Sequence, residues 1–175
     1  MDITLVVAVA DNGVIGHGGA IPWHISDDMK RFKALTLGKP LIVGRKTWDS
    51  FPRKPLPGRT NIVVTRDAGW QAAGAVVVHS LAEGIARAKS DDPAEIIVAG
   101  GAQIYLAAMP LATRIELTQV HLDPEGDTRL PPFDPAHWRE ASRESHVAPD
   151  GTAYDYVSLT CRGGRAGASG VQSGL

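Results

Sequence analysis

The apolar run ITLVVAVA, from Ile3 to Ala10, is the segment that decides the fold. It is nearly continuous rather than alternating, which is typical of a strand buried on both faces in a sheet covered by helices. The same signature recurs in PLIVG (Pro40–Gly44), TNIVVT (Thr60–Thr65), AVVVH (Ala75–His79) and EIIVAG (Glu95–Gly100). These runs predict the strands of a largely parallel sheet.

Helical patterns lie between these apolar runs. One begins at Ser26, which we expect to be the N-cap, and extends to about Leu35. Another begins at SLAEGIARAK, where Ser80 and Glu83 have the spacing of a capping box. A third follows in GGAQIYLAAM, Gly100–Met109. Strands that alternate with helices in one short chain predict an α/β domain.

The last third of the chain changes character. ATRIELTQVHL (Ala112–Leu122) predicts one strand, and WREASRES (Trp138–Ser145) and TAYDYVSLTC (Thr152–Cys161) predict two alternating strands. Alternation is typical of antiparallel pairing, so we expect an antiparallel finish to the sheet. The segment GGRAGASGVQSGL, residues 163–175, is small and polar. We therefore expect a folded domain over residues 1–162 and a flexible C-terminal tail.

Composition excludes several classes of function. The 175 residues fit one domain, and a net charge of −1 with dispersed Lys and Arg argues against nucleic acid as the main partner. The single cysteine, Cys161, excludes an internal disulfide and fits a reducing compartment. Because paired histidine ligands are also lacking, we expect no metal site. Cys161 ends an alternating run, which favours a packed strand residue over a nucleophile.

The N-terminal apolar run is neither a signal peptide nor a membrane span. It lacks a basic flank and follows Asp2. No apolar run approaches the roughly 20 residues needed to cross a bilayer. We therefore expect no membrane partner and a cytoplasmic location, and monomer is the default because no oligomerisation surface is evident.

Two adjacent acids, Asp27 and Asp28, stand in the stretch IPWHISDDMKRF. Acids in the first turn of a helix favour its dipole, and Asp27 lies four residues before Arg31, which predicts a solvated ion pair. At 100° per residue, Asp28 instead points with Phe32 and Leu35 along the apolar stripe. A carboxylate placed there is costly to bury unless it is paired. It needs either a polar partner inside the protein or a ligand that supplies donors.

Glycines, arginines and a hydroxyl follow the predicted parallel strands, at the edge where ligands of α/β sheets bind. VAGGAQIY places a Gly100–Gly101 turn before a helix, LIVGRKTW places Arg45 and Thr47 after a strand, and IVVTR ends in Arg66. The sequence is not a P-loop, because an arginine separates its glycine from its lysine. Cations and helix-start N–H groups together indicate a polyanionic ligand. A further arginine beside the ribose is typical of a reader of the 2′-phosphate.

The chain resembles dihydrofolate reductase of the bacterial type from about Thr4 to Leu159. The segments that carry the resemblance, in order, are DNGVIG, IPWHISDDMKRFK, PLIVGRKTWDSF, PLPGRTNIVVTR, IIVAGGAQIY, IELTQV and EGDT. The resemblance implies a single α/β domain with an eight-stranded, mostly parallel sheet, an antiparallel C-terminal strand and about four flanking helices. It also implies NADPH-dependent reduction of 7,8-dihydrofolate to 5,6,7,8-tetrahydrofolate in one-carbon metabolism, and binding of antifolate inhibitors.

The family's substrate pocket maps onto the chain residue by residue. Asp28 matches the acid that accepts bonds from the pterin N3–H and 2-amino group, Thr118 matches the threonine that supports it, and Trp23 completes the expected catalytic set. The expected substrate contacts are Val7, Ala8, Asp28, Met29, Phe32, Phe51, Leu56, Arg59 and Thr118. Arg59 matches the arginine that grips the α-carboxylate of the substrate. Whether Arg53 or Lys54 faces the substrate tail stays open.

The cofactor site maps in the same way. The expected contacts are Ala8, Ile15, Gly16, Ile21, Gly44, Arg45, Lys46, Thr47, Thr65, Arg66, His79, Gly100, Gly101, Ala102, Gln103 and Ile104. Residues 16–23 match a mobile loop that closes over the nicotinamide, and Asp127 in EGDT lies in a segment that can contact that loop.

The resemblance implies hydride transfer from C4 of NADPH to C6 of the pterin, with a proton delivered to N5. Asp28 would grip the opposite edge of the ring, so we expect water to deliver the proton. Two alternatives remain. One is a reductase of the related riboflavin-pathway type, which the Trp23–Asp28–Phe32 set and Arg59 disfavour. The other is a non-catalytic folate- or NADPH-binding paralogue.

Overall fold

A computed structural model describes residues 1–163 of the chain. The strands in this part are β1 (Asp2–Ala10), β2 (Val14–Gly16), β3 (Leu41–Gly44), β4 (Asn61–Val64), β5 (Ala75–Val78), β6 (Glu95–Val98), β7 (Arg114–Val120), β8 (Thr128–Arg129), β9 (Trp138–Val147) and β10 (Ala153–Cys161). The helices are α1 (Ser26–Thr36), α2 (Arg45–Ser50), α3 (Leu81–Lys89) and α4 (Ala102–Ala108). The predicted mobile tail lies outside the described residues, except for Gly163.

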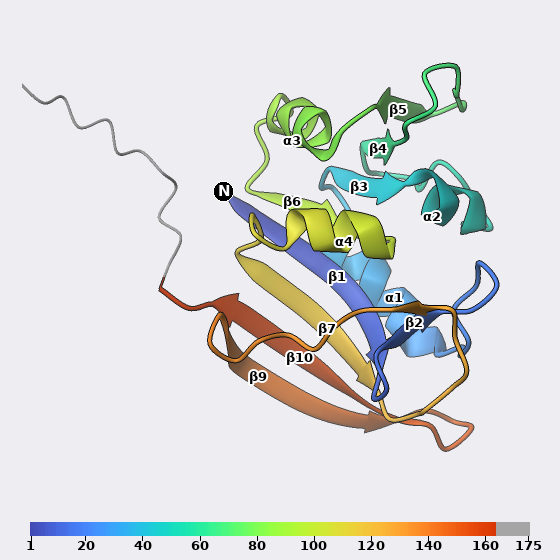
Figure 1. Cartoon of the computed structure of the whole chain (residues 1–175), viewed down its shortest axis with the longest axis vertical. Coiled ribbons are helices and arrows are strands. Elements are labelled where there is room, and N and C mark those ends of the chain that lie inside the picture. Colours follow the sequence, from blue (N-terminus) through green and yellow to red (C-terminus); the bar gives the residue numbers. More distant parts are fainter. Residues whose placement is uncertain (164–175) are drawn as a thin grey trace, which may run out of the picture.

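Eight strands form one sheet in the order β5-β4-β3-β6-β1-β7-β10-β9 (Figure 1). Strand β1 lies near its middle and pairs in parallel with β6 on one side and β7 on the other. In this sheet β10 alone runs against the rest, because it pairs antiparallel with both β7 and β9. The expected α/β sheet, mostly parallel with an antiparallel C-terminal strand, is confirmed.

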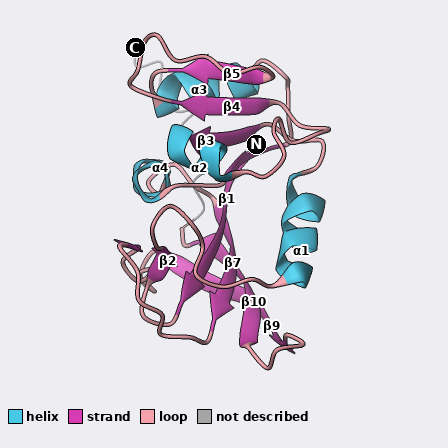
Figure 2. Cartoon of the chain, turned by 90° about the vertical axis from the view of Figure 1, so that its right-hand side faces the viewer, coloured by secondary structure: helices cyan, strands magenta, loops and turns pink. Residues whose placement is uncertain are grey.

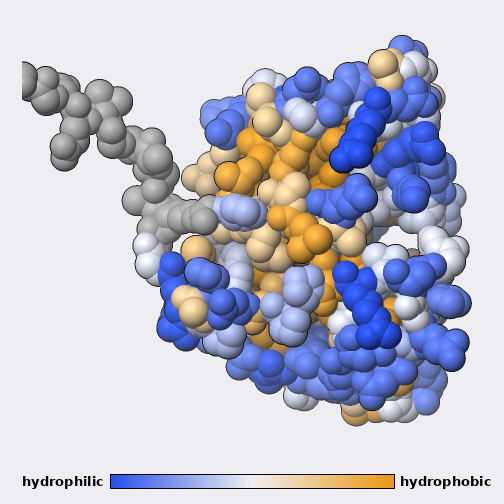
Figure 3. Space-filling model, viewed as in Figure 1, coloured by the Kyte–Doolittle hydropathy of each residue, from blue (hydrophilic) through white to orange (hydrophobic). Residues whose placement is uncertain are grey.

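The parallel strands are buried on both faces, which explains their continuous apolar runs. Ile42 and its neighbours on one face pack with Tyr105 of α4, while Leu41 and its neighbours on the other pack with Trp48 of α2 and Phe32 of α1. Figure 2 shows the sheet between α1 on one side and α4 on the other. On the face seen in Figure 3, apolar side chains gather in the middle and hydrophilic ones surround them.

The predicted Ser80 cap is confirmed, but Glu83 returns its bond to His79 and not to Ser80 as a full capping box requires. The predicted cap of the first helix is wrong. The Glu83 N–H donates to Ser80 Oγ at 3.1 Å, and the Glu83 carboxylate accepts from the His79 N–H at 2.9 Å. In α1, Ser26 is already the first helical residue and Ile25 is the N-cap, without a side-chain cap. Ile25 is buried at the helix entry, so burial of an apolar residue fixes this start rather than a hydroxyl.

A short helix and a small two-stranded sheet are not among the elements predicted from the sequence. Helix α2 has 6 residues and follows β3 directly at Gly44. Strands β2 and β8, of 3 and 2 residues, pair antiparallel as a separate small sheet. Segments of this length are too short for a periodic pattern. Both lie beside the predicted ligand edge, so they help to shape the site.

Candidate active site

Asp28 faces the sheet from the first turn of α1. Its Oδ1 accepts a hydrogen bond from the Thr118 hydroxyl of β7 at 2.6 Å. Phe32 and Leu35, which share its side of the helix, are partly buried, whereas Asp27 is exposed. The structure thus confirms the different directions that the helical spacing predicts for the two acids.

The environment of Asp28 favours a perturbed carboxyl group. Burial raises the pKa of Asp28, and the hydrogen bond from Thr118 and the positive charge of Arg31 partly offset that rise. Perturbed acids in partly apolar surroundings are typical of functional sites. The arrangement can hold a ligand that offers two donors to one carboxylate.

The predicted ion pair between Asp27 and Arg31 is wrong. Arg31 instead turns into the molecule, where its Nη2 lies 3.0 Å from Glu116 Oε2 on β7. Its guanidinium carbon also lies 4.0 Å from the centre of the Tyr156 ring. A less exposed carboxylate and an aromatic face compete better for the guanidinium than a solvated first-turn acid does.

Tyr105 is a site residue that the sequence reasoning missed. It lies on α4 and is almost wholly buried, and its hydroxyl donates to the Val6 carbonyl of β1 at 2.7 Å. Burial and then the negative charge of Asp28 raise the pKa of Tyr105. A side chain at Gly100 would begin 3.5 Å from the Tyr105 hydroxyl, so the tyrosine lies beside the glycine turn. The apolar helical pattern around Tyr105 predicts a core residue. In the sequence, only the hydroxyl of a tyrosine, which needs a hydrogen-bond partner when buried, could have indicated a role in the site.

The apolar residues predicted to surround a ring divide into three groups. Phe32, Phe51 and Leu56 pack against one core cluster on the α1–α2 side of the sheet, which brings them together. Trp23 packs instead with the cluster around Ile25 and Val120. Val7 is buried in the opposite cluster, under α3 and α4, so only its backbone can face the α1 side.

The remaining predicted substrate contacts lie at the rim. Met29 is 55 % exposed, and Ala8 is partly buried on β1. Arg59 precedes β4, and its Nη1 donates to the Thr36 hydroxyl at the end of α1 at 2.9 Å. Burial lowers the pKa of Arg59. The arginine also lines a pocket of about 370 Å³ with Lys39, Asp91 and Asp92, but no other predicted substrate contact lines that pocket. A guanidinium held in this way can bind an anionic group.

Two cations precede Arg59 in the proline-rich loop. Lys54 Nζ donates to the Asp49 carbonyl at 3.0 Å, so the lysine is tied to the end of α2, whereas Arg53 is exposed. Which of the two faces a substrate tail stays an open prediction.

The glycines at the ends of β3 and β6 form one close-packed turn. The Gly44 N–H donates to the Gly100 carbonyl at 2.8 Å. A side chain at Gly100 would begin 3.2 Å from Thr47 Oγ1, and its φ of +125° also favours glycine. At Gly44 the corresponding contact is Ile104 Cγ1 at 3.3 Å. Glycine therefore lets the ends of β3 and β6 pack closely against Thr47 and Ile104.

Helices α2 and α4 begin at these turns. Their N-caps, Gly44 and Gly101, provide no side-chain hydrogen bond to the helix-start N–H groups. In contrast, Ser80 caps α3. Because β3 and β6 are neighbours in the sheet, both uncapped helix starts lie at the same edge. N–H groups at such an edge can bind phosphate oxygens.

The predicted cationic residues follow β3 and β4. Arg45 lies 3.8 Å from Asp49 and 3.9 Å from Asp67, both long contacts, while Lys46 and Arg66 are exposed. The imidazole of His79 lies 2.9 Å from the Thr65 carbonyl, which joins the ends of β4 and β5. Weakly engaged arginines can be recruited by a polyanion. Ala102, Gln103 and Ile104 follow on α4.

The loop of residues 16–23 contacts the segment predicted to meet it. Gly18 N–H donates to Asp127 Oδ2 at 2.9 Å, and the Asp127 N–H donates to the Gly16 carbonyl at 3.2 Å. The bond from Gly18 is the main cause that lowers the pKa of Asp127. Ile15 and Gly16 are partly buried, and Ile21 is 58 % exposed. The apolar Ile21 side chain is therefore available to a ligand.

Within residues 1–163, no three His, Cys, Asp or Glu side chains are grouped to hold a metal ion. In the same part, no helix is long and apolar enough to span a membrane.

Comparison with known proteins gives one consistent family. The family model described as dihydrofolate reductase matches residues 2–162. A dihydrofolate reductase of Neisseria meningitidis serogroup A is 51% identical over 158 residues, which cover 90% of this chain and 96% of the relative. The type 3 dihydrofolate reductase of Salmonella typhimurium is 43% identical over 162 residues, covering 91% and 98%.

A solved structure agrees with these sequence relatives. It is a dihydrofolate reductase from Enterococcus faecalis in complex with NADP(H) and RAB-propyl, with a TM-score of 0.84 and 32% identity. The similarity covers 92% of this chain and 96% of that chain. Fold and relatives together define an α/β oxidoreductase. The chain belongs to the dihydrofolate reductase family.

Proposed function

We propose that Asp28 is the residue that recognises the pterin in this enzyme. The reaction of the family, and of this chain, is the NADPH-dependent reduction of 7,8-dihydrofolate to 5,6,7,8-tetrahydrofolate, which supports one-carbon metabolism. The observation that carries the assignment is the 2.6 Å hydrogen bond from Thr118 to an inward-facing acid. Thr118 occupies one oxygen edge of the carboxylate and leaves the rest to accept from the pterin N3–H and 2-amino group.

The surroundings of Asp28 fit the rest of such a substrate. Phe32, Phe51 and Leu56 pack on one cluster beside α1 and offer an apolar wall to flat rings. Arg59, held by the Thr36 hydroxyl at the far end of α1, would pair with the α-carboxylate of the substrate. In this assignment Trp23 covers the ring near the loop, Met29 lies at the rim, and Val7 and Ala8 contribute through β1.

The hydrogen-bond donors and cations that follow β3, β4 and β6, which we call the cofactor edge, suit the phosphate groups of NADPH. Glycine backbone at residues 44, 100 and 101, the Thr47 hydroxyl and uncapped helix starts suit a pyrophosphate. The cations suit the remaining phosphate, and Arg66 is our candidate reader of the 2′-phosphate. The residues assigned to this site are Ala8, Ile15, Gly16, Ile21, Gly44, Arg45, Lys46, Thr47, Thr65, Arg66, His79, Gly100, Gly101, Ala102, Gln103 and Ile104.

The protein's own part in the reaction is alignment, charge and exclusion of water. NADPH, when bound, supplies the hydride that is added to C6 of the pterin. Asp28 holds the pyrimidine edge, which lies away from N5, so a water molecule delivers the N5 proton. The charge of Asp28 favours the electron-poor, protonated ring that accepts hydride. The loop of residues 16–23, latched by Asp127 through Gly18 and Gly16, would close the site.

We expect a monomer that binds dihydrofolate and antifolate inhibitors, with no nucleic-acid or membrane partner and a cytoplasmic location. We also expect residues 1–162 to form the whole catalytic domain. A chain truncated after residue 162 should keep full activity, and gel filtration should give one chain per particle.

One assay tests the proposed function against its alternatives. NADPH absorbance is followed with and without dihydrofolate, and the active enzyme is then titrated with an antifolate at nanomolar concentrations. We expect oxidation that requires dihydrofolate and is inhibited stoichiometrically. Turnover of a ribosylated pyrimidine instead would favour the riboflavin-pathway type of reductase, and ligand binding without turnover would favour a non-catalytic paralogue.

A further inference from the structure

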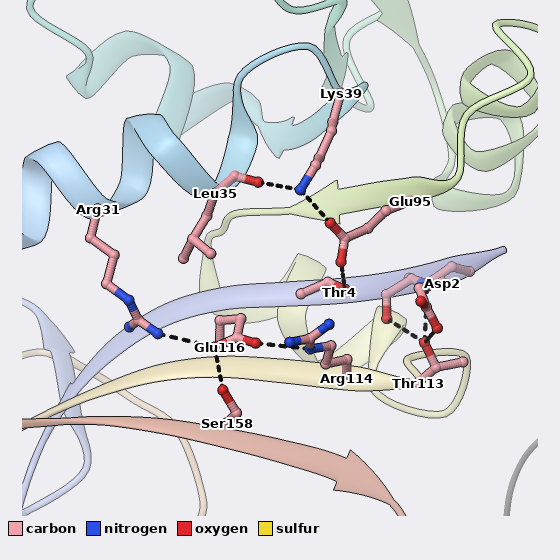
Figure 4. A network of polar contacts seen from close by, with 11 residues as sticks. Asp2, Thr4, Arg31, Leu35, Lys39, Glu95, Thr113, Arg114, Glu116 and Ser158 are labelled. Atoms are coloured by element: carbon pink, nitrogen blue, oxygen red, sulfur yellow. Dashed lines mark hydrogen bonds and ion pairs between the residues drawn. The ribbon is translucent and has the colours of Figure 1, made fainter. Parts of the chain in front are cut away.

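Arg31 bonds Glu116 on β7, two residues along the strand from the Thr118 that bonds Asp28. It lies three residues after Asp28 on α1, so the two side chains are neighbours on the helix surface. Its guanidinium binds Glu116 at 3.0 Å and lies over the Tyr156 ring at 4.0 Å. Its side chain is 21% exposed, so most of it is removed from water. Figure 4 shows Arg31 reaching from α1 to Glu116.

Glu116 is itself anchored from several sides. Its side chain is 5% exposed, and it accepts from Arg114 at 2.8 Å and from Ser158 at 2.7 Å in addition to Arg31 (Figure 4). The position of the Arg31 guanidinium is therefore set by strands β7 and β10 rather than by solvent. Loss of Arg31 would leave Glu116 with two partners, so such a variant is expected to fold.

We propose that Arg31 is a positioning residue that holds the Asp28 carboxylate ionised for the pterin, while Thr118 orients it. The inference rests on the proposed role of Asp28 and adds a residue to it. Asp28 can accept two bonds from the ligand only as a carboxylate, because a protonated carboxyl loses acceptor capacity on one oxygen. A nearby cation held by other elements favours the charged form without occupying the ligand's place.

Asp28 accepts a hydrogen bond from Thr118 on β7. The ionisable groups that interact with its charge are Arg31 on α1, Tyr105 on α4 and Tyr156 on β10, and Glu116 on β7 binds Arg31. Burial raises the pKa of Asp28, while Thr118 and Arg31 lower it. Burial also raises the pKa of both tyrosines, which stay neutral.

Glu116 keeps a second cationic partner, since Arg114 binds it at 2.8 Å. Among the described residues, Arg31 is the cation that lowers the pKa of Asp28.

Arg31 could instead serve only to tie α1 to β7, and a set of variants separates the two roles. Arg31→Gln keeps a donor for Glu116 but loses the charge, and Arg31→Met loses both. Arg31→Lys keeps the charge on a shorter side chain. Lys30→Met is the matched control, because it removes one positive charge from the exposed neighbour on the same helix.

The test is a ¹³C NMR titration of the Asp28 carboxyl carbon in the ligand-free enzyme, with Asp28→Asn identifying the signal. We expect the pKa of Asp28 to rise by about one unit in Arg31→Gln and Arg31→Met. It should stay close to the wild-type value in Arg31→Lys and in Lys30→Met. An unchanged pKa in Arg31→Gln and Arg31→Met would overturn the proposal, as would an equal rise in Lys30→Met.

The pH profile of kcat/KM for dihydrofolate separates this inference from the proposed function. If both hold, the acid limb of the profile moves upward by the same amount as the pKa of Asp28. If the pKa moves and the acid limb does not, the role of Asp28 in substrate binding fails while the effect of Arg31 on Asp28 stands. Thermal melting of each variant shows whether the tie between α1 and β7 contributes separately to stability.

Discussion

The two ends of the site differ in how far their polar groups are already engaged within the protein. At the Asp28 end, side chains from α1, β7 and β10 are joined by contacts of 2.6–3.0 Å. At the cofactor edge, the contacts of Arg45 are 3.8 and 3.9 Å, and Arg66 is exposed. The pterin end is therefore preorganised by the fold, whereas the cations of the cofactor edge await a polyanion.

Asp28→Asn should lower kcat/KM for dihydrofolate by about 100-fold or more at neutral pH. The variant loses the negative charge that strengthens the two hydrogen bonds to the pterin, and such bonds are each worth roughly 1.5–3 kcal/mol when one partner is ionised. Steady-state kinetics measures the effect. Asp27→Asn is the matched control and should stay within about twofold, since Asp27 is exposed on the other side of the helix. Full turnover by Asp28→Asn would remove Asp28 from the centre of the mechanism.

Arg66→Ala should weaken NADPH binding by about 30-fold and leave NADH binding almost unchanged, because it would remove one charge-assisted phosphate contact. The measurement is the ratio of kcat/KM for the two cofactors. Arg53→Ala, which removes an exposed arginine from the proline-rich loop, serves as the control. If both cofactors weaken equally, Arg66 is not the reader of the 2′-phosphate.

Thr118→Val should lower kcat/KM for dihydrofolate by about fivefold and raise the pKa of Asp28. The variant removes one 2.6 Å hydrogen bond to a carboxylate that keeps the charge of Arg31 nearby. The acid limb of the pH profile should move upward. An unaltered profile would mean that the hydrogen bond does not favour the ionised acid.

His121→Gln should have the smallest effect, a loss of about 1–2 °C in melting temperature at acidic pH. Burial opposes the charging of His121, but hydrogen bonds to Asp11 and Asp155 outweigh it and raise the pKa of the histidine. A raised pKa in the folded state gives stability that is full below the unfolded value of 6.5 and is lost as the pH rises through the folded value. The difference in melting temperature between variant and wild type should therefore be larger at about pH 5.5 than at about pH 8.5, which lie on either side of that window. A difference that grows with pH would contradict the assignment.

Much of the fold could be predicted from local pattern. The buried parallel strands have continuous apolar runs because both of their faces are covered, and Asp28 could be separated from Asp27 because helical spacing fixes direction. The partner of Arg31 could not be found in this way. Helical spacing offers only neighbours on the same helix, and Glu116 lies 85 positions away on β7.

Other parts of the site needed either the family resemblance or the structure. The roles of Thr118 and Arg59 came from the resemblance, since a lone threonine in a strand and a lone arginine in a loop have no distinctive spacing. Tyr105 was missed because its helix pattern predicts a core residue. The start of α1 at a buried Ile25 was missed because tertiary burial outweighed the local preference for a serine cap.

Binding measurements on Asp28→Asn separate the two ends of the site, because dihydrofolate and NADPH are expected to bind at different ends. Isothermal titration calorimetry would compare dihydrofolate and NADPH binding to the variant and to the wild-type enzyme. If Asp28 binds the pterin, affinity for dihydrofolate falls about 100-fold while affinity for NADPH stays within about twofold. An unchanged affinity for dihydrofolate, or an equal loss for both ligands, would contradict it.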